Sequence, residues 1–174
     1  MKWILAIVGV LVILVLVVII VGYSLPVAHV ASRSATIKAS PSDVYTAITD
    51  ASAFPSWRND VKIVDILPPV NGQPSWREKG ENGVITFVVV RADPGRSVVT
   101  RIADKDLPFG GEWEYTLTPT ATGTTLTITE RGEVYNPVFR FVSRFVMGHT
   151  ATIDAYLAAL TRKFGGEGTP VTSA

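Results

Sequence analysis

Short connections between β-rich segments limit the fold of this chain more than any other feature. Between residues 61 and 134, apolar and polar residues alternate, and many of the side chains are β-branched or aromatic, as in strands with one buried face. The turns between these stretches, such as PPVNGQP, DPGR and TATG, supply the proline or glycine that a turn needs. A parallel crossover takes a dozen residues or more, so neighbouring strands must be antiparallel.

An earlier β-like segment brings the predicted strands to seven. This segment precedes the first helical pattern, and the other six follow it as a meander. The predicted strands are Arg33–Ala39, Val61–Leu67, Ser75–Gly80, Gly83–Ala92, Ser97–Asp104, Glu112–Pro119 and Thr124–Val134.

Helical patterns flank the meander on both sides. SPSDVYTAITD provides Ser40 or Ser42 as an N-cap and places Pro41 in the first turn. A second, short helical turn broken by Pro55 follows, and Phe54 and Trp57 are expected to plug one end of the sheet. From Asn136-Pro137 to Phe164 we predict one long helix. Its apolar stripe has three- and four-residue spacing and contains Val138, Val142, Phe145, His149, Ile153, Tyr156, Leu160 and Phe164.

The N-terminus carries an uninterrupted apolar run from Trp3 to Gly22, without a charge or a side-chain amide. About twenty such residues cross the hydrocarbon core of a bilayer. A cleavable signal peptide is the alternative, but its apolar core is normally only about 7–15 residues long. We therefore expect a retained single-pass anchor. Lys2 precedes the span, which favours a cytoplasmic N-terminus and an extracytoplasmic domain, and the absence of cysteine fits a bacterial inner membrane.

Four regions follow from these patterns: a transmembrane anchor over 1–23, a linker over 24–31, one folded domain over 32–164 and a disordered tail over 165–174. The formal net charge is +1, and basic residues are scattered among acidic ones. This distribution lacks the basic patch of a nucleic-acid-binding protein. No protein partner is indicated.

The stretch IKASPSDVYTAITDASAFPSWRNDVKIVDIL closely resembles the opening of the START/polyketide-cyclase superfamily, also called SRPBCC. The matching positions are Pro41, Val44, Tyr45, Ile48, Asp50, Phe54, Pro55 and Trp57. GTTLTITERGEV and TIDAYLAALTRKF resemble the last strand and long helix of that superfamily, so the similarity covers Arg33 to Phe164. The resemblance implies an α+β helix-grip fold, in which a curved antiparallel sheet grips the C-terminal helix around a hydrophobic cavity.

The residue inventory offers little for catalysis. Cysteine is absent and only two histidines occur, which excludes thiolate chemistry and leaves few ligands for a metal. His29 falls in the predicted linker. We therefore expect no metal and no cofactor.

Glu130 and His149 are polar residues at positions where apolar ones are expected. Strict alternation places Glu130 on the face of Leu126 and Ile128, and His149 lies on the helix stripe. The two side chains then point into the cavity from opposite walls, where they orient a ligand or act as an acid–base pair. The alternative is that Gly132 marks a bulge that turns Glu130 outward, while His149 is an ordinary helix histidine at the cavity mouth.

Other candidate ligand-binding residues are mainly aromatic. Trp113 shares a face with Tyr115, and these rings serve the core, a ligand or both. Arg101 shares a face with Val99 and Ala103. The segment FRFVSRFVM is either the core stripe of the helix or a bilayer contact. The complete candidate set is Trp57, Phe87, Arg101, Trp113, Tyr115, Glu130, Phe145, His149 and Ile153.

Three functions are compatible with these features. The first is a membrane-anchored domain that binds a hydrophobic small molecule, lipid or isoprenoid-like, between the sheet and the C-terminal helix. The second is a cyclase- or dehydratase-like enzyme that uses Glu130 and His149. The third is an envelope scaffold with a vestigial cavity. We prefer the first, because the sequence contains no established catalytic motif.

Overall fold

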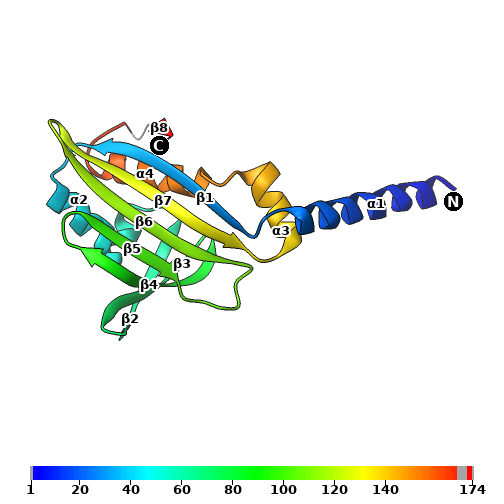
Figure 1. The fold of residues 1–174 in the computed structure, drawn as a ribbon, viewed down its shortest axis with the longest axis horizontal. Coiled ribbons are helices and arrows are strands. Elements are labelled where there is room, and N and C mark those ends of the chain that lie inside the picture. The colour runs from blue at the N-terminus through cyan, green and yellow to red at the C-terminus, as the bar shows by residue number, and fades with distance from the viewer. Residues whose placement is uncertain (1, 168–171, 174) are drawn as a thin grey trace.

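The structure, a computed structural model of the chain, describes residues 2–167 and 172–173. Its centre is one antiparallel sheet with the order β2-β3-β4-β5-β6-β7-β1-β8 (Figure 1). The strands are β1 Ala28–Ile37, β2 Val61–Val70, β3 Gln73–Gly80, β4 Gly83–Asp93, β5 Ser97–Ile102, β6 Phe109–Thr120, β7 Gly123–Val134 and β8 Thr172–Ser173. The seven predicted strands are therefore confirmed, and β8 adds two residues at the edge beside β1.

Helical segments precede, interrupt and follow the sheet. They are α1 Lys2–Ser24, α2 Pro41–Thr49, the 3₁₀ helix η1 Ala51–Ser56, α3 Pro137–Val142, the π-helix η2 Ser143–Met147 and α4 Ala151–Lys163. α2 begins as predicted: Ser40 is the N-cap, its hydroxyl accepts from the Asp43 N–H, and Pro41 follows in the first turn. Residues of α4 share one apolar core with β1, β5, β6 and β7, which confirms the helix-grip arrangement.

The first strand is longer than its sequence predicts. β1 begins at Ala28, and its ladder with β7 runs from the Ala28–Glu133 pair to the Ile37–Thr124 pair. Four of the eight residues predicted as linker over 24–31, from Ala28 onward, therefore belong to the sheet. Backbone hydrogen bonds to β7 order this segment, whose small side chains give little β signal of their own. The tail predicted as disordered over 165–174 lies partly outside the described residues.

The predicted long C-terminal helix is interrupted. α3 passes directly into η2, which ends at Gly148, where φ is 76°. This left-handed conformation suits glycine and stops a right-handed helix. The apolar stripe continues across the break, so periodicity alone conceals it. The break separates Phe145, on η2, from Ile153, on α4.

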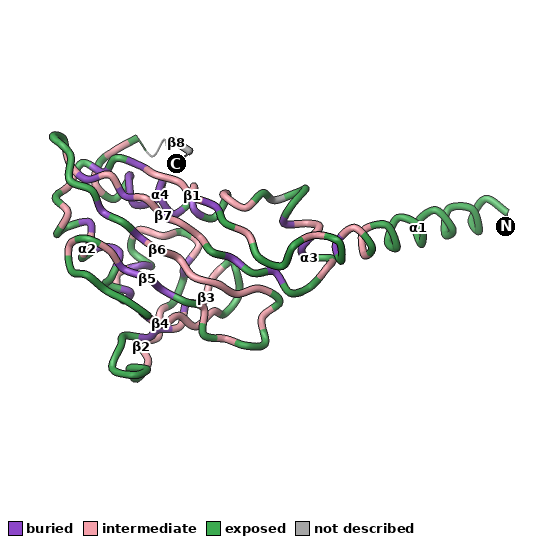
Figure 2. Tube along the Cα trace, in the orientation of Figure 1, coloured by how far each residue is buried: buried purple, intermediate pink, exposed green. Residues whose placement is uncertain are grey.

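The core lies between the sheet and α4. Its largest fully buried side chains come from β1, α2, β5, β7 and α4, and they are Ile37, Val44, Val98, Leu126, Ile128, Ile153, Leu157 and Leu160. Each contributes about 1.5–3 kcal/mol by leaving water. Figure 2 shows the buried residues gathered in this domain, while α1 is exposed along most of its length.

α1 extends away from the domain as a separate arm (Figure 1). It has 23 residues, and the mean hydropathy of its central window is 3.8. Its length and composition are those of a helix that crosses a membrane, since about 20 residues at 1.5 Å each match a hydrocarbon core of about 30 Å.

Candidate functional site

Tyr156 of α4 faces the inner side of the sheet and is the centre of an aromatic cluster. Trp113 and Tyr115 alternate inward on β6, and their ring centroids lie 5.8 Å and 5.7 Å from that of Tyr156. The ring of Trp57 approaches Tyr156 from the end of η1, at 5.3 Å and nearly perpendicular to it. Three aromatic side chains from two parts of the sheet domain thus converge on one helix residue.

The corner around Pro55 closes the same end of the sheet. Phe54 is buried, and its ring contacts Trp57 at 5.7 Å and Trp76 at 6.1 Å between centroids. Trp76 in turn stacks on Phe87 at 5.6 Å. The predicted plug by Phe54 and Trp57 is present, with Phe54 the more deeply buried of the two. The aromatic interior consists of Phe54, Trp57, Trp76, Phe87, Trp113, Tyr115 and Tyr156.

Two donor groups in the aromatic interior lack a hydrogen-bond partner within residues 2–167 and 172–173. The indole N–H of Trp57 and the hydroxyl of Tyr156 are buried, and no described residue forms a hydrogen bond with either. An unpaired buried polar group costs about 1–3 kcal/mol. Burial, followed by the nearby Tyr115 hydroxyl, raises the pKa of Tyr156, and burial raises that of Tyr115. Both phenols therefore stay protonated at neutral pH, and Tyr156 is able to donate to an acceptor.

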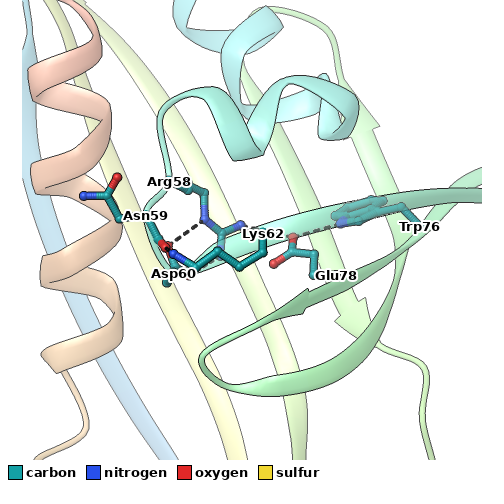
Figure 3. Close-up of polar contacts among 6 residues, drawn as sticks. All are labelled: Arg58, Asn59, Asp60, Lys62, Trp76 and Glu78. Carbon is teal, nitrogen blue, oxygen red and sulfur yellow. Dashed lines mark hydrogen bonds and ion pairs between the residues drawn. The ribbon is translucent and has the colours of Figure 1, made fainter.

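A charged network lies beneath these rings, at the start of β2 (Figure 3). Arg58 donates from Nη2 to Asp60 Oδ2 at 2.7 Å and from Nη1 to Glu78 Oε1 at 3.1 Å. Trp76 Nε1 donates to the same Glu78 oxygen at 2.9 Å. The Arg58 guanidinium also lies 5.2 Å from the ring centroid of Tyr156. Through Arg58, the network connects the segment after η1 to β3 and α4.

The charges of this network are mutually compensating. The side chains of Arg58 and Glu78 are only 12% and 10% exposed. Burial by itself lowers the pKa of Arg58, but Glu78 and Asp60 more than offset this effect and raise it. The guanidinium therefore remains charged, and its donors are directed to carboxylates.

A second polar cluster joins His29, Glu130 and His149. His29 Nε2 lies 3.2 Å from Glu130 Oε1, and the imidazole of His149 stacks on that of His29 with a centroid separation of 4.0 Å. β7 keeps its register through Gly132, which pairs with Gly111 on one side and His29 on the other. The bulge considered above is therefore absent, and Glu130 points inward.

Burial shifts the pKa of all three members of this cluster. It lowers the pKa of His29 and, with help from His29 and Arg144, that of His149. It raises the pKa of Glu130, an effect that Trp113 and His149 partly offset. The cluster therefore favours neutral imidazoles and holds a carboxyl group that protonates more easily than an exposed one, which are properties of an acid–base site.

The predicted site residues separate into three groups. Trp57, Phe87, Trp113 and Tyr115 lie in the aromatic interior, with Ile153 fully buried nearby on α4. Glu130 and His149 meet through His29. The structure does not bring the remaining two, Arg101 and Phe145, to either place.

Arg101 and Phe145 lie away from the interior for different reasons. Arg101 alternates to the outer face of β5, where its Nε donates to Glu112 Oε1 at 2.8 Å. Phe145 is 59% exposed and packs on Phe141 of α3, because the helix breaks at Gly148. Our expectation that both residues contact an interior ligand has no support in this geometry.

Several residues of the site are not evident from the sequence. His29 falls in the segment predicted as linker, because the small residues that follow it give little strand signal of their own. Arg58 and Glu78 have the sequence context of ordinary surface charges. One signal points to an inward carboxylate: Glu78 lies two residues after Trp76, and this spacing places both side chains on the same face of a strand. Tyr156 was assigned to the helix stripe but not to the site.

A hollow lies on the outer face of the sheet. It has a volume of about 410 Å³ and is lined by Val90, Arg91, Val99, Glu112, Glu114 and Arg131. Ion pairs of Glu114 with Arg91 and of Glu112 with Arg101 cross this face. Between the sheet and α4, by contrast, the aromatic side chains pack against one another. Among residues 2–167 and 172–173, no three His, Asp or Glu side chains are arranged to hold a metal ion.

Solved structures of similar fold include a START superfamily protein and aromatase/cyclases. A START superfamily protein from Mycobacterium smegmatis is 21% identical, with a TM-score of 0.63 over 78% of this chain and 97% of that one. The aromatase/cyclase ZhuI from Streptomyces sp. R1128 is 14% identical, with a TM-score of 0.62 over 80% and 99%. The di-domain aromatase/cyclase StfQ from the steffimycin biosynthetic pathway is 16% identical, with a TM-score of 0.62, and the match covers 79% of this chain and 51% of StfQ.

Sequence comparison identifies the family. No curated protein matches the chain significantly. The family described as "Polyketide cyclase / dehydrase and lipid transport" matches residues 28–165, from the first residue of β1 to just beyond α4. The resemblance to the START/polyketide-cyclase superfamily is thereby confirmed, and the chain belongs to the polyketide cyclase/dehydrase and lipid transport family.

Proposed function

We propose that the chain is a membrane-anchored domain that binds a hydrophobic small molecule between the sheet and α4. One observation carries this proposal: the Trp57 indole N–H and the Tyr156 hydroxyl are buried among aromatic rings without a partner in the described part of the chain. A ligand with an apolar body and one oxygen acceptor packs against the rings and accepts hydrogen bonds from the donors.

The energetics favour such a ligand over a strongly polar one. Apolar area removed from water contributes about 25 cal/mol per Å² before the costs of association. A single ligand oxygen that accepts from Trp57 or Tyr156 recovers part of the penalty of the unpaired donor. The cation of Arg58 is already bound by Asp60 and Glu78, so the interior does not call for an anionic group. A lipid or isoprenoid-like molecule has the required chemistry.

Binding requires one of the packed rings to move. Trp57 is the candidate, because it follows the short helix η1 and is only half-buried, whereas Phe54 beside it is fully buried. Displacement of the Trp57 ring opens the interior toward Tyr156, its neighbour at 5.3 Å.

The proposed anchoring rests on α1, whose length and apolar composition fit a membrane span. We propose that the domain lies on the extracytoplasmic side of a bacterial inner membrane, because Lys2 precedes the span. The chain lacks native cysteine, so one added surface thiol in intact cells reports the side. Labelling by an impermeant reagent without lysis is the expected result, and labelling only after lysis would reverse the orientation.

A fluorescence titration with a dansyl-labelled fatty alcohol, which is uncharged, tests the binding proposal. Tyr156→Phe keeps the ring and removes the hydroxyl, so we expect affinity to fall about 5- to 10-fold, corresponding to one hydrogen bond of about 1 kcal/mol. Tyr45→Phe is the matched control, because Tyr45 is a half-buried tyrosine at the margin of the core. Equal affinities for the parent and both variants, or no binding by the parent, would contradict the proposal.

An acid–base enzyme is the second candidate, and the His29–Glu130–His149 cluster favours it. One interpretation of the sequence has Glu130 and His149 act as an acid–base pair, and His29 lies between them, with a 3.2 Å contact to Glu130 and a ring stacked on His149. Solved structures of similar fold include aromatase/cyclases. This candidate predicts chemistry on the bound molecule rather than simple retention of it.

A further inference from the structure

Apolar side chains are exposed on the helical segment that precedes α4. Val138 is 43% exposed, Phe145 59% and Val146 72%. Val138 and Phe145 are seven residues apart, with the half-buried Phe141 and Val142 between them, so one helical face carries this apolar surface. We call Val138, Phe145 and Val146 the apolar patch.

The same segment packs against the C-terminal end of α1. Gly22 is buried there, and a side chain at its position would collide with the backbone of Pro137. This close approach sets the end of α1 directly on the first turn of α3. In Figure 1, α3 crosses the end of α1 instead of continuing along it.

Arg140 forms hydrogen bonds that hold the junction of α1 and α3 together. It is only 8% exposed, and its Nη1 donates to the carbonyl oxygens of Gly22 at 3.1 Å and Leu25 at 2.8 Å. Its Nε and Nη2 donate to the carbonyl oxygens of Val134 and Tyr135. The last carbonyls of a helix lack partners within the helix and carry partial negative charge. One guanidinium therefore joins the end of α1 to the end of β7.

These contacts fix the height of the apolar patch relative to α1. The apolar run of α1 ends at Gly22, so a bilayer spanned by α1 has its boundary at this junction. Tyr23 and Tyr135 are 70% and 47% exposed at the same place, and tyrosine is enriched at membrane interfaces. Arg144 is exposed on η2, where a cation suits lipid phosphates.

We infer that α3 and η2 lie on the bilayer surface, with the apolar patch in the lipid interface, and that Arg140 is the positioning residue that holds them there. This inference rests on the proposed membrane span of α1. A lipid surface is the occupant that the junction favours, because the patch is continuous with the exit point of the apolar helix. The end of the sheet that carries His29 and His149 then faces the membrane.

Spin labels on the full chain in phosphatidylcholine nanodiscs test this inference. Single cysteines replace Val146 on η2, Ile13 in the middle of α1, and Ile66 on β2 as the control. Ile66 is 64% exposed, close to the 72% of Val146. Power saturation with oxygen and a water-soluble nickel chelate measures immersion. We expect oxygen to relax the labels at Ile13 and Val146 more strongly, and the nickel chelate to relax the label at Ile66.

The outcomes distinguish this inference from the proposed anchoring. A label at Val146 that behaves like the one at Ile66, while Ile13 is in lipid, would overturn the inference and leave the anchor intact. An Ile13 label that is accessible to nickel would reject the anchor itself. Protection of Val146 from both reagents would mean that protein, such as a second copy, covers the patch, and would also overturn the inference.

Substitution of Arg140 tests its positioning role. Arg140→Gln removes donors from the junction, and we expect the Val146 label to become several-fold more accessible to nickel while the thermal melting of the sheet domain persists. Arg96→Gln, an exposed arginine in the turn between β4 and β5, is the control and leaves accessibility unchanged. Should Arg140→Gln fail to fold, Gly22→Val separates α1 from Pro137 and has the same expected effect. Unchanged immersion in whichever junction variant folds would refute the role of this contact.

Discussion

The imidazole of His29 stacks on that of His149, with 4.0 Å between ring centroids and 24° between their planes. One ring comes from the first strand and the other from the loop before α4. Stacked imidazoles at this distance repel each other when both are protonated. Glu130, 3.2 Å from His29, is the nearby group that moderates this repulsion.

Stability should fall on mild acidification because of this pair. Burial lowers the pKa of both histidines from the ordinary value of 6.5, so the unfolded chain binds protons first as the pH drops through 6.5. Stability then decreases until the folded histidines also protonate. The raised pKa of Glu130 acts oppositely, because stability is lost as the pH rises from the ordinary value of 4.5 through the higher pKa of the folded state. Melting temperatures between pH 7 and pH 5 measure the histidine effect.

The variant His29→Gln/His149→Gln is the control for this pH dependence. The chain has only two histidines, so the double substitution removes every imidazole. We expect its melting temperature to change less between pH 7 and pH 5 than that of the parent. The same slope in both proteins would show that the stacked pair is not the source.

Gly132 makes room for His29, and Gly132→Ala should therefore be destabilising. An added methyl group would lie 2.7 Å from Glu130 Oε1 and would overlap the His29 ring. Overpacking of this kind costs about 1–3 kcal/mol. Chemical denaturation of Gly132→Ala, alone and combined with His29→Ala, forms a double-mutant cycle. The cost should shrink in the His29→Ala background, and an equal cost in both backgrounds would refute the contact.

Arg58 should be important for folding, because its removal leaves Glu78 buried without a cation. Breaking a buried pair in this way costs about 3–5 kcal/mol, so Arg58→Met should lower the free energy of unfolding by that amount. Arg91→Met is the matched control: the Arg91 side chain is 65% exposed and pairs with Glu114 on the outer face. Exposed pairs contribute about 0–1 kcal/mol. Similar losses in the two variants would contradict the burial of this network.

Glu130→Gln and His149→Gln distinguish a binding protein from an enzyme. If the cluster performs acid–base chemistry, either change should lower turnover about 10²–10⁴-fold with binding nearly intact. If the domain only binds, both variants should retain the ligand and the parent should form no product. Glu112→Gln is the control, since Glu112 pairs with Arg101 on the outer face. Product analysis on the lipid that co-purifies with the parent decides between the two.

Local rules predicted much of the fold. Ser40 and Pro41 mark the start of α2, as predicted, and the buried residues of this helix are Val44, Ala47 and Ile48. Alternation along β6 placed Trp113 and Tyr115 on one face, and both rings lie against Tyr156 of α4. The sequence left two orientations open for Glu130, and the continuous register at Gly132 excludes the bulge that would turn it outward. The successes in α2 and β6 share a cause: each depends on a period or a cap within one element.

The remaining strand boundaries and site contacts depend on segments that are distant in the sequence, so patterns within a single element do not predict them. The His29 segment becomes a strand through its ladder with β7, and Arg58 meets Glu78 because β2 pairs with β3. The break at Gly148 was concealed because apolar spacing continues through it. Prolines led us to end β2 at Leu67, yet it runs to Val70, since an edge strand tolerates proline where no ladder bond is needed.

Native mass spectrometry of the full chain, purified in mild detergent, tests the central claim most directly. The claim is that the aromatic interior around Tyr156 holds an apolar molecule that satisfies the unpaired donors of Trp57 and Tyr156. We expect the parent to carry a non-covalent apolar molecule and Tyr156→Phe to carry less of it, while Arg101→Gln on the outer face retains it fully. A parent spectrum that shows only the bare chain, or equal occupancy in the parent and Tyr156→Phe, would contradict this account.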